Sequence, residues 1–229
     1  MLDEPLGLTV HSLPAVGEAV DSDSRRTRTG RWKMLAVMAV CAAPVIASYL
    51  TYYVVRPEGR RNFGELVEPQ RPLPALQAST LEGSAVPLQS LRGQWLLVSV
   101  AGGACDAGCA KNLYLQRQLR EGLGKEKDRL DWVWLVADGA PVRSSLQPAL
   151  AQATVLRIDP QVLAQWLAPA PGKQLPEHLY LVDPMGNWMM RFPAPATEQI
   201  DTASAKNIKR DLDRLLKASA SWDQPGRSR

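Results

Sequence analysis

Cysteine and histidine are scarce in this chain of 229 residues, which contains three cysteines and two histidines. So few cysteines exclude a small domain held together by several disulfides, and a four-ligand zinc site of cysteine and histidine would need at least one histidine as well. The chain also lacks three motifs: a phosphate-binding Gly-rich loop that ends in Lys and Ser or Thr, the His-Glu-x-x-His motif, and the Gly-x-Ser-x-Gly motif. No sequence signature of a nucleotide-binding P-loop, a zinc protease or a serine hydrolase is therefore present.

Charge and hydrophobicity exclude two further classes of protein. With 45% hydrophobic and 22% charged residues, the chain is not disordered throughout. The net charge is +4, but the basic residues form no compact stripe with interleaved aromatic residues, so nucleic-acid binding is not indicated. The hydrophobic residues are instead concentrated in one segment near the N-terminus.

Residues 34–55 form a run of 22 residues without a charge, MLAVMAVCAAPVIASYLTYYVV. A helix of this length spans about 33 Å, which is enough to cross a hydrocarbon core of about 30 Å. Trp32 stands before the run and three tyrosines stand near its other end, as in an aromatic belt. The run predicts one transmembrane helix, which Pro44 should kink, and Cys41 within it is interpreted as a small apolar residue.

The flanking charges predict the orientation of this helix. Residues 24–33 contain five basic residues and no acid, whereas residues 56–70 contain three basic residues mixed with acids. By the positive-inside rule, residues 1–33 form a cytoplasmic tail, which we expect to be disordered, and the rest of the chain lies outside the cytoplasm. A signal peptide cleaved after Val45-Ile46-Ala47 is the alternative. Residues 56–72 contain several prolines and predict a linker.

Residues 73–218 predict one α/β domain, and residues 219–229 a flexible C-terminal tail. Continuous apolar runs predict buried strands at 95–100, 130–137 and 178–183, and a fourth strand follows at 188–192. Apolar residues at helical spacing predict a helix after Cys109 and a last helix over 208–216. This order of elements predicts a mixed sheet flanked by helices.

Cys105 and Cys109 stand four positions apart between the first of these strands and the following helix. The amino end of a helix stabilises a thiolate, so we expect Cys105 to be the more reactive sulfur, although the neighbouring Asp106 opposes a second negative charge. Two sulfurs at this spacing can close a small disulfide ring or bind Cu(I). The pair therefore predicts a redox site, a copper site or a static disulfide that holds the loop.

Two blocks of sequence resemble the thioredoxin-like superfamily. The first is LQSLRGQWLLVSVAGGACDAGC at 88–109, which resembles the strand, small-residue turn and cysteine pair of its membrane-anchored extracytoplasmic branches. The second is QLPEHLYLVDPMGNWMMRF at 174–192, which resembles the block of proline, strand, turn and strand in the same superfamily. The resemblance implies a thioredoxin-like fold, in which Pro176 would be the cis-proline beside the cysteines.

Within the superfamily, the three residues between the cysteines resemble the Sco/SenC family, which assists copper insertion into cytochrome c oxidase. That resemblance implies copper as a ligand, an oxidase subunit as a partner, and Cys105, Cys109 and a histidine as metal ligands. The prolines that this family places after each cysteine are Asp106 and Ala110 here, and its histidine aligns near Leu175 instead of His178.

Membrane-anchored thiol reductases of the TlpA type match the proline and strand block better, but they have two residues between the cysteines. His178 is the only histidine of the predicted domain, and it is either a third copper ligand or an ordinary strand residue.

We therefore expect a protein of a bacterial inner membrane with a periplasmic thioredoxin-like domain that assists cytochrome c oxidase assembly. Three chemistries stay open: copper delivery by Cys105, Cys109 and His178; thiol–disulfide exchange with Cys105 as the attacking and Cys109 as the resolving sulfur; and a scaffold with a static bridge. General periplasmic thiol–disulfide reduction is the alternative function.

Overall fold

The computed structural model describes residues 16–55, 62–193, 202–223 and 225–226. The chain divides into two compact units, Met1–Gly59 and Arg60–Arg229, and each is considered by itself. His11 and the other residues before Val16 lie outside the described residues.

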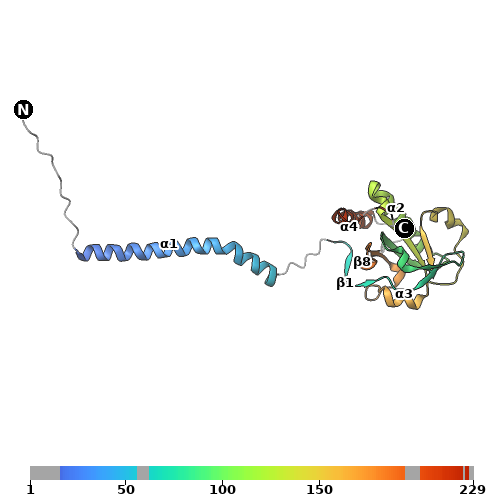
Figure 1. Cartoon of the computed structure of the whole chain (residues 1–229), viewed down its shortest axis with the longest axis horizontal. Helices are drawn as coiled ribbons and strands as arrows, with labels where there is room; N and C mark the ends of the chain where they lie inside the picture. The colour runs from blue at the N-terminus through green and yellow to red at the C-terminus, as the bar shows by residue number, and fades with distance from the viewer. Residues whose placement is uncertain (1–15, 56–61, 194–201, 224, 227–229) are drawn as a thin grey trace, which may run out of the picture. The chain divides into compact units, whose positions relative to one another are not determined.

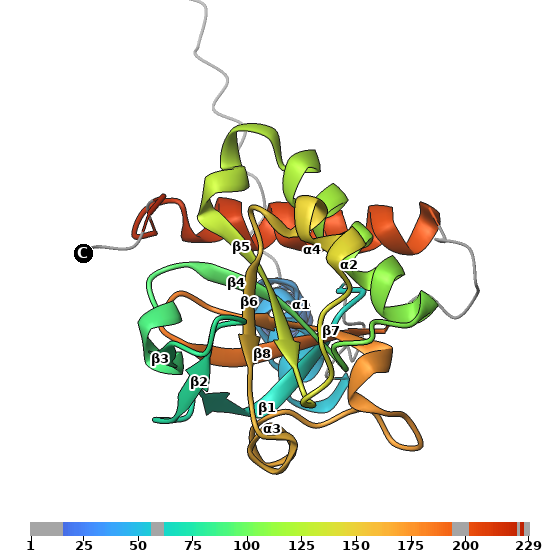
Figure 2. The ribbon, with the colours of Figure 1, turned by 90° about the vertical axis from the view of Figure 1, so that its right-hand side faces the viewer.

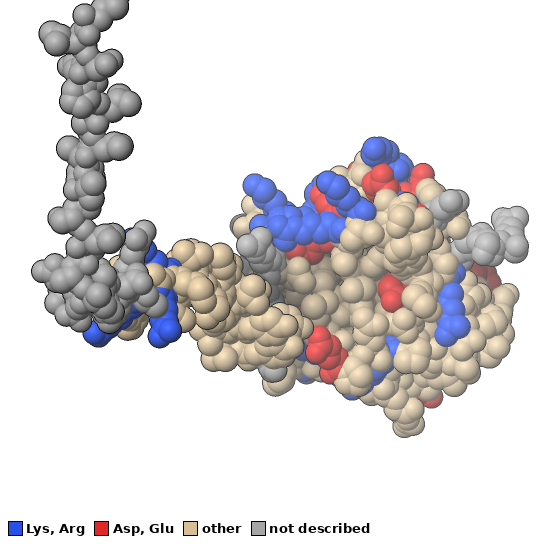
Figure 3. All heavy atoms as spheres, turned by 60° about the vertical axis from the view of Figure 1, so that its left-hand side comes forward, with Lys and Arg blue, Asp and Glu red and all other residues tan. Residues whose placement is uncertain are grey.

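The first unit is a long helix, α1 (Val16–Leu50), continued by the π-helical turn η1 (Thr51–Val55) (Figure 1). Residues Arg28–Val54 are long and apolar enough to cross a membrane, with a mean hydropathy of 2.0 over the most apolar window, and none of that window is buried. The predicted span at 34–55 lies within α1 and η1. In Figure 3, basic side chains of α1 lie just before an uncharged stretch of the helix.

The helix starts earlier than the sequence predicts. Because α1 begins at Val16, the expectation of a disordered tail over 1–33 differs from the structure for residues 16–33. This stretch contains no proline, so helix can extend from the apolar segment at the small cost of adding single residues to an existing helix. Pro44 stands inside α1, and the helix continues past it.

The second unit is built on a mixed sheet of eight strands in the order β1-β8-β7-β4-β5-β6-β2-β3. The strands are β1 (Glu65–Pro72), β2 (Gln77–Ser79), β3 (Ala85–Pro87), β4 (Trp95–Ala101), β5 (Leu130–Val136), β6 (Thr154–Arg157), β7 (His178–Val182) and β8 (Asn187–Pro193). The helices are α2 (Ala107–Gly122), α3 (Pro160–Trp166) and α4 (Thr202–Ser219), with short 3-10 turns η2 (Leu88–Leu91), η3 (Gly124–Arg129), η4 (Ser144–Leu150) and η5 (Leu175–Glu177).

The centre of the sheet is β4, which runs parallel to β5 and antiparallel to β7. Every residue of β4 is buried, as its continuous apolar sequence predicts for a strand covered on both faces. Leu97 and its neighbours on one face pack against α2 and α4, and Leu96 and its neighbours on the other face share a core with Leu163 of α3. Figure 2 shows α2 and α4 together on one side of the sheet and α3 on the other. The prediction of a thioredoxin-like mixed sheet between helices is confirmed.

Two segments expected to lie outside the domain belong to it. The predicted linker at 56–72 contains the edge strand β1, which pairs with β8 and tolerates prolines because one side of an edge strand needs no hydrogen bonds. The predicted flexible tail at 219–229 begins with a packed segment, in which Ser219 and Asp223 are buried. The predicted domain, residues 73–218, is therefore narrower than the folded unit.

Pro176 does not have the predicted cis peptide bond. Among the described residues the one cis bond lies between Glu68 and Pro69. Pro176 instead stands in the first turn of η5, where the fixed φ of a trans proline suits a helical start.

Candidate functional site

The two cysteines lie directly after the central strand. β4 ends at Ala101, a short glycine turn follows, and α2 begins at Ala107. Cys105 and Cys109 are joined by a disulfide with their Cα atoms 5.1 Å apart. The prediction that these two sulfurs can close a small ring is confirmed.

Glycines in this turn allow another loop to pack directly against it. A Cβ on Gly102 would collide with the carboxylate of Asp138, and one on Gly103 would collide with the backbone carbonyl of Ala140. The Asp138 carboxylate also accepts hydrogen bonds from Gly103 N at 2.8 Å and from Ala140 N at 3.1 Å. The loop after β5 is thereby fixed against the turn that carries the cysteines.

Cys105 has an unusual backbone conformation, which two hydrogen bonds support. Its φ is +44°, in the left-handed region that residues other than glycine and asparagine rarely adopt. Its N–H donates to the carbonyl of Gly102 at 3.1 Å, and its own carbonyl accepts a hydrogen bond from the guanidinium of Arg143. A residue held in a strained conformation by its surroundings is a common property of functional sites.

Sequence reasoning missed the parts played by Asp138 and Arg143. Both residues come from the loop after β5: Asp138 lies 35 positions along the chain from Gly103, and Arg143 lies 38 positions from Cys105. No motif or spacing connects the two segments, which meet only because β4 and β5 run parallel and end at the same edge of the sheet.

Asp106 caps α2. Its Oδ1 accepts a hydrogen bond from Cys109 N at 2.8 Å, which satisfies one of the unpaired N–H groups in the first turn. The carboxylate that was expected only to oppose a thiolate therefore also fixes the start of the helix that carries Cys109.

Both cysteines are buried in the disulfide form, with 2% of Cys105 and 5% of Cys109 exposed. They pack with Leu113 of α2 and with Trp132 and Trp134 of β5. The indole N–H of Trp134 is buried and has no hydrogen-bond partner among the described residues. The disulfide therefore lies in an apolar setting, which strengthens any charge interaction that a released thiolate makes.

His178 is not brought into this cluster. Its Nε2 accepts a hydrogen bond from Ala170 N at 3.1 Å, its Nδ1 lies 3.3 Å from the carbonyl oxygen of Phe192, and its ring contacts that of Tyr180. Tyr180 belongs to the core on the α3 face, whereas the cysteines pack with Trp132 and Trp134 on the α2 face. Burial lowers the pKa of His178 below its ordinary value, so the ring is held neutral.

The segment before His178 does reach the helix of the cysteines. The amide of Asn112, three residues after Cys109, donates to the carbonyl of Pro176 at 3.0 Å. Pro176 therefore contacts α2 through its carbonyl, with a trans peptide bond, whereas the resemblance implies a cis-proline beside the cysteines. Among the described residues no three His, Cys, Asp or Glu side chains come close enough together to hold a metal ion.

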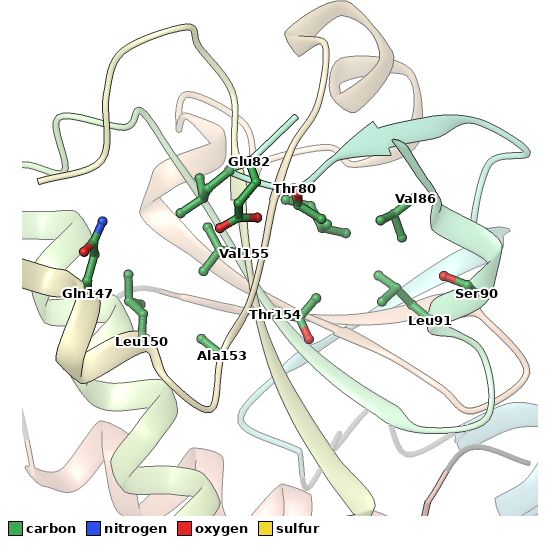
Figure 4. A pocket seen from close by; sticks show the side chains of 12 residues that line it. Thr80, Glu82, Val86, Ser90, Leu91, Gln147, Leu150, Ala153, Thr154 and Val155 are labelled. Carbon is green, nitrogen blue, oxygen red and sulfur yellow. The ribbon is translucent and has the colours of Figure 1, made fainter. Parts of the chain in front are cut away.

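Another cavity of the folded unit lies between the hairpin of β2 and β3 and the edge of β6 (Figure 4). It has a volume of about 620 Å³, and its polar lining includes Thr80, Glu82 and Gln147. Glu82 is exposed, and hydrogen bonding from Thr80 lowers its pKa, so it is an ordinary surface carboxylate. Since this lining contains no cysteine or histidine, the disulfide is the better candidate for chemistry.

The chain is similar at low identity to several solved structures. A SCO1/SenC family lipoprotein from Bacillus anthracis shares 15% identity over 66% of this chain and 99% of that chain, with a TM-score of 0.47. Copper-bound ScoI of Bradyrhizobium japonicum shares 20% identity over 59% of this chain and 96% of its own, with a TM-score of 0.42. The thioredoxin domain of a thiol-disulfide oxidoreductase from Bacteroides vulgatus shares 15% identity over 63% of this chain and 95% of that chain, with a TM-score of 0.43.

None of the curated proteins matches the chain. Two family models do match, and together they cover both units. Residues 24–55 match the transmembrane-like N-terminal domain, and residues 95–219 match the transmembrane-like, thioredoxin-like C-terminal domain. The second match extends from the start of β4 to the end of α4, more than half of the chain and the whole segment that carries the disulfide. The chain therefore belongs to the transmembrane-like, thioredoxin-like family.

Proposed function

We propose that this protein is a membrane-anchored thiol–disulfide exchange factor whose reactive groups are Cys105 and Cys109. The observation that carries the proposal is the disulfide itself, which lies between the end of the central strand and the first turn of α2. A closed pair at the amino end of a helix can be reduced to two thiols, and the helix end stabilises the thiolate that must attack.

The exchange transfers two electrons. In the reduced protein the Cys105 thiolate attacks one sulfur of a partner's disulfide, forms a mixed disulfide with that sulfur, and releases the other partner sulfur as a thiolate, which takes up a proton. Cys109 then loses its proton and attacks the sulfur of Cys105, which breaks the mixed disulfide and releases the second partner thiol. The partner is reduced to two thiols, and the Cys105–Cys109 disulfide is formed.

We place the disulfide domain in the periplasm of a bacterium, with α1 in the inner membrane and the N-terminus in the cytoplasm. The excess of basic residues before the apolar segment supports this orientation. The disulfide agrees with it, because disulfides persist outside the reducing cytoplasm. Within this setting we propose assembly of cytochrome c oxidase as the pathway served, on the strength of the Sco-like spacing of the cysteines.

The same spacing supports a second candidate function, the carriage of Cu(I) as cargo between the two thiolates of the reduced pair. His178 does not fit the role of third ligand, since both of its ring nitrogens already lie at hydrogen-bonding distance from the backbone. Copper bound here would therefore be held by the two sulfurs alone, and replacing His178 would leave its affinity unchanged.

The test uses the full-length protein in lipid nanodiscs. We expect a disulfide potential between about −270 and about −180 mV, the range from thioredoxin to protein disulfide isomerase. We also expect the Cys109→Ser variant to accumulate a mixed disulfide between Cys105 and a disulfide-bearing partner, whereas the Cys105→Ser variant should accumulate none. A potential below about −300 mV together with no mixed disulfide would leave only a structural bridge.

Copper is tested on the same preparation by anaerobic Cu(I) titration of the reduced protein against millimolar glutathione. Stoichiometric binding that survives this competition, and that is lost in both cysteine variants, would establish cargo carriage. Retention of Cu(I) by the wild type combined with a twofold or greater loss in His178→Gln would contradict the two-sulfur arrangement.

A further inference from the structure

A small cavity is lined by residues of the cluster in which the two cysteines pack. It has a volume of about 200 Å³ and is enclosed by one face of α2, the strand β5 and the turn η4. In Figure 2, α2 (green) and η4 (yellow) lie side by side. Cavities that hold whole small-molecule ligands measure about 300 Å³ or more, so this one has the size for a single large side chain.

The wall of this cavity is also the packing shell of the cysteines. Ala110, which follows Cys109 in α2, forms part of the lining. Leu113, Trp132 and Leu150 line the cavity and also pack in the same cluster as Cys105 and Cys109. A side chain that fills the cavity would therefore contact residues that also pack around the disulfide.

The rim of the cavity has the composition of a protein-binding surface. Tyr114 is 55% exposed, one of the few large apolar side chains of the folded unit that are left in solvent. Arg117, one turn further along α2, is exposed and is the one charged residue among the described residues of the lining. Tyrosine and arginine around an apolar depression are the residues that contribute most to binding in protein interfaces.

We propose that this cavity is the recognition site for the protein whose disulfide is exchanged, and that it binds a large apolar side chain, phenylalanine or leucine, followed by an acidic residue. The apolar side chain occupies the space between α2 and η4, and the acidic residue lies against Arg117. The inference rests on the proposed function for the identity of the partner as a disulfide-bearing polypeptide. The inference goes beyond the proposed function because it names the segment of that polypeptide that is recognised.

The first measurement does not depend on redox chemistry. A fluorescently labelled peptide with the core Phe-Glu, and with serine in place of cysteine, is titrated with the full-length protein in nanodiscs and followed by anisotropy. Loss of one buried aromatic anchor costs about tenfold in affinity or more, so the Ala-Glu peptide should bind at least about tenfold more weakly. Exchange of Glu for Lys should weaken binding by about threefold, as expected for one exposed ion pair.

Two variants connect the binding to the cavity. Ala149→Phe places a ring from η4 over the cavity and should abolish the preference for Phe over Ala. The matched control is Ala218→Phe, an exposed alanine on α4, which should leave the preference intact. Arg117→Glu should reverse the preference between the Glu and Lys peptides, whereas Arg210→Glu, also exposed on α4, should not.

The second measurement compares exchange rates of the reduced protein with hydroxyethyl disulfide and with a Phe-Glu peptide carrying a mixed disulfide. Ala149→Phe should slow the peptide reaction by about tenfold and leave the small disulfide unaffected. Equal binding of the Phe and Ala peptides by the wild type would overturn the recognition site. No reaction of the wild type with hydroxyethyl disulfide would instead overturn the proposed exchange chemistry, and the anisotropy titration would still decide whether the cavity binds the peptide.

Discussion

One end of the central strand β4 is closed by a buried polar network, and the other end leads into the disulfide. At its amino end, Trp95 donates its indole N–H to Asp223 Oδ2 at 2.8 Å, and the same oxygen accepts from Arg129 Nη2 at 2.7 Å. Ser219 completes the cluster by accepting from Arg129 at 2.8 Å. These four side chains are all buried, so this end of the domain is closed by a satisfied polar network.

At its carboxyl end, β4 leads into glycines, the strained Cys105 and the disulfide. There the exposed Arg143 donates to the carbonyl of Cys105, and the Asp138 carboxylate accepts from Gly103 N. One strand thus connects an end closed by a buried polar network to an end that carries the disulfide. We infer that stability and chemistry are separated along β4.

The largest effect should come from the closed end. Asp223→Ala removes the buried acceptor that Arg129 and Trp95 share and leaves Arg129 with Glu126 at 2.7 Å, and loss of one member of a buried ion pair costs up to about 3–5 kcal/mol. We expect the free energy of unfolding to fall by about that amount in urea denaturation of the full-length protein. The control is Asp213→Ala, which removes an exposed ion pair with Lys209 and should cost less than about 1 kcal/mol.

The same variant tests whether the two ends are separate. The disulfide potential of Asp223→Ala should equal that of the wild type under conditions where the variant is folded, because Asp223 contacts β4 at Trp95 only, six residues before Ala101. A shift in potential as large as that of a cysteine-site variant would show that the two ends are coupled through the strand.

The second effect concerns the open end. The disulfide closes a ring of only five residues, for which the loss of chain entropy in the unfolded state predicts about 2 kcal/mol of stabilisation. Reduction with dithiothreitol should lower the free energy of unfolding by about this amount and leave the sheet intact. Complete unfolding on reduction would mean that the disulfide is a structural support, and it would remove the contrast with the closed end.

Both ends show what the sequence could predict. The buried strands at 95–100 and 178–183 and the last helix were predictable, because an apolar run or a helical spacing reports burial within one segment. The pairing of Cys105 with Cys109 was predictable for the same reason, since the two residues are close in the chain.

Contacts between distant segments were not predictable. Asp223 stands in a polar stretch that looks like a free tail, and nothing in that stretch indicates that Arg129, 94 residues earlier, will pair with it. Arg143 and Asp138 gave no signal either, because they look like ordinary residues of a surface loop. His178 was considered as a ligand because the Sco/SenC resemblance implies a histidine and the predicted domain has no other, but the alternation of side chains along β7 places it with Tyr180.

A third, smaller effect concerns the start of α2. Asp106→Ala removes the side-chain acceptor of Cys109 N, and loss of such a helix cap costs about 1 kcal/mol. Asp106→Asn keeps an acceptor oxygen and should restore most of the stability, so the pair of variants separates the cap from the charge. If the charge of Asp106 also opposes the thiolate, both variants should exchange with hydroxyethyl disulfide faster than the wild type. Equal rates in all three proteins would show that the cap is its only role.

The smallest effect concerns His178. It stands at the same end of the sheet as the cysteines, but both of its ring nitrogens lie at hydrogen-bonding distance from the backbone. Its pKa in the folded protein is lowered by burial and also by the positive charge of Arg191, while the hydrogen bond to the Phe192 carbonyl and the charges of Glu177 and Glu65 act in the opposite direction. The unfolded chain therefore takes up this proton at a higher pH than the folded protein does. The contribution of His178 to stability is then complete above its ordinary pKa of about 6.5 and is lost as the pH falls below it.

Urea denaturation of the wild type between pH 7.5 and pH 5.5 should show this loss, and His178→Gln should lack that component of the pH dependence. At pH 5.5 the wild type should therefore have lost more of its pH 7.5 stability than the variant has. The sign of the change in stability with pH is decisive, because a histidine that pairs with a negative charge when protonated would stabilise the fold as the pH falls. A wild type that gains stability relative to His178→Gln on acidification would show that the protonated ring has a charged partner in the folded protein. The description of a buried, neutral ring would then be wrong.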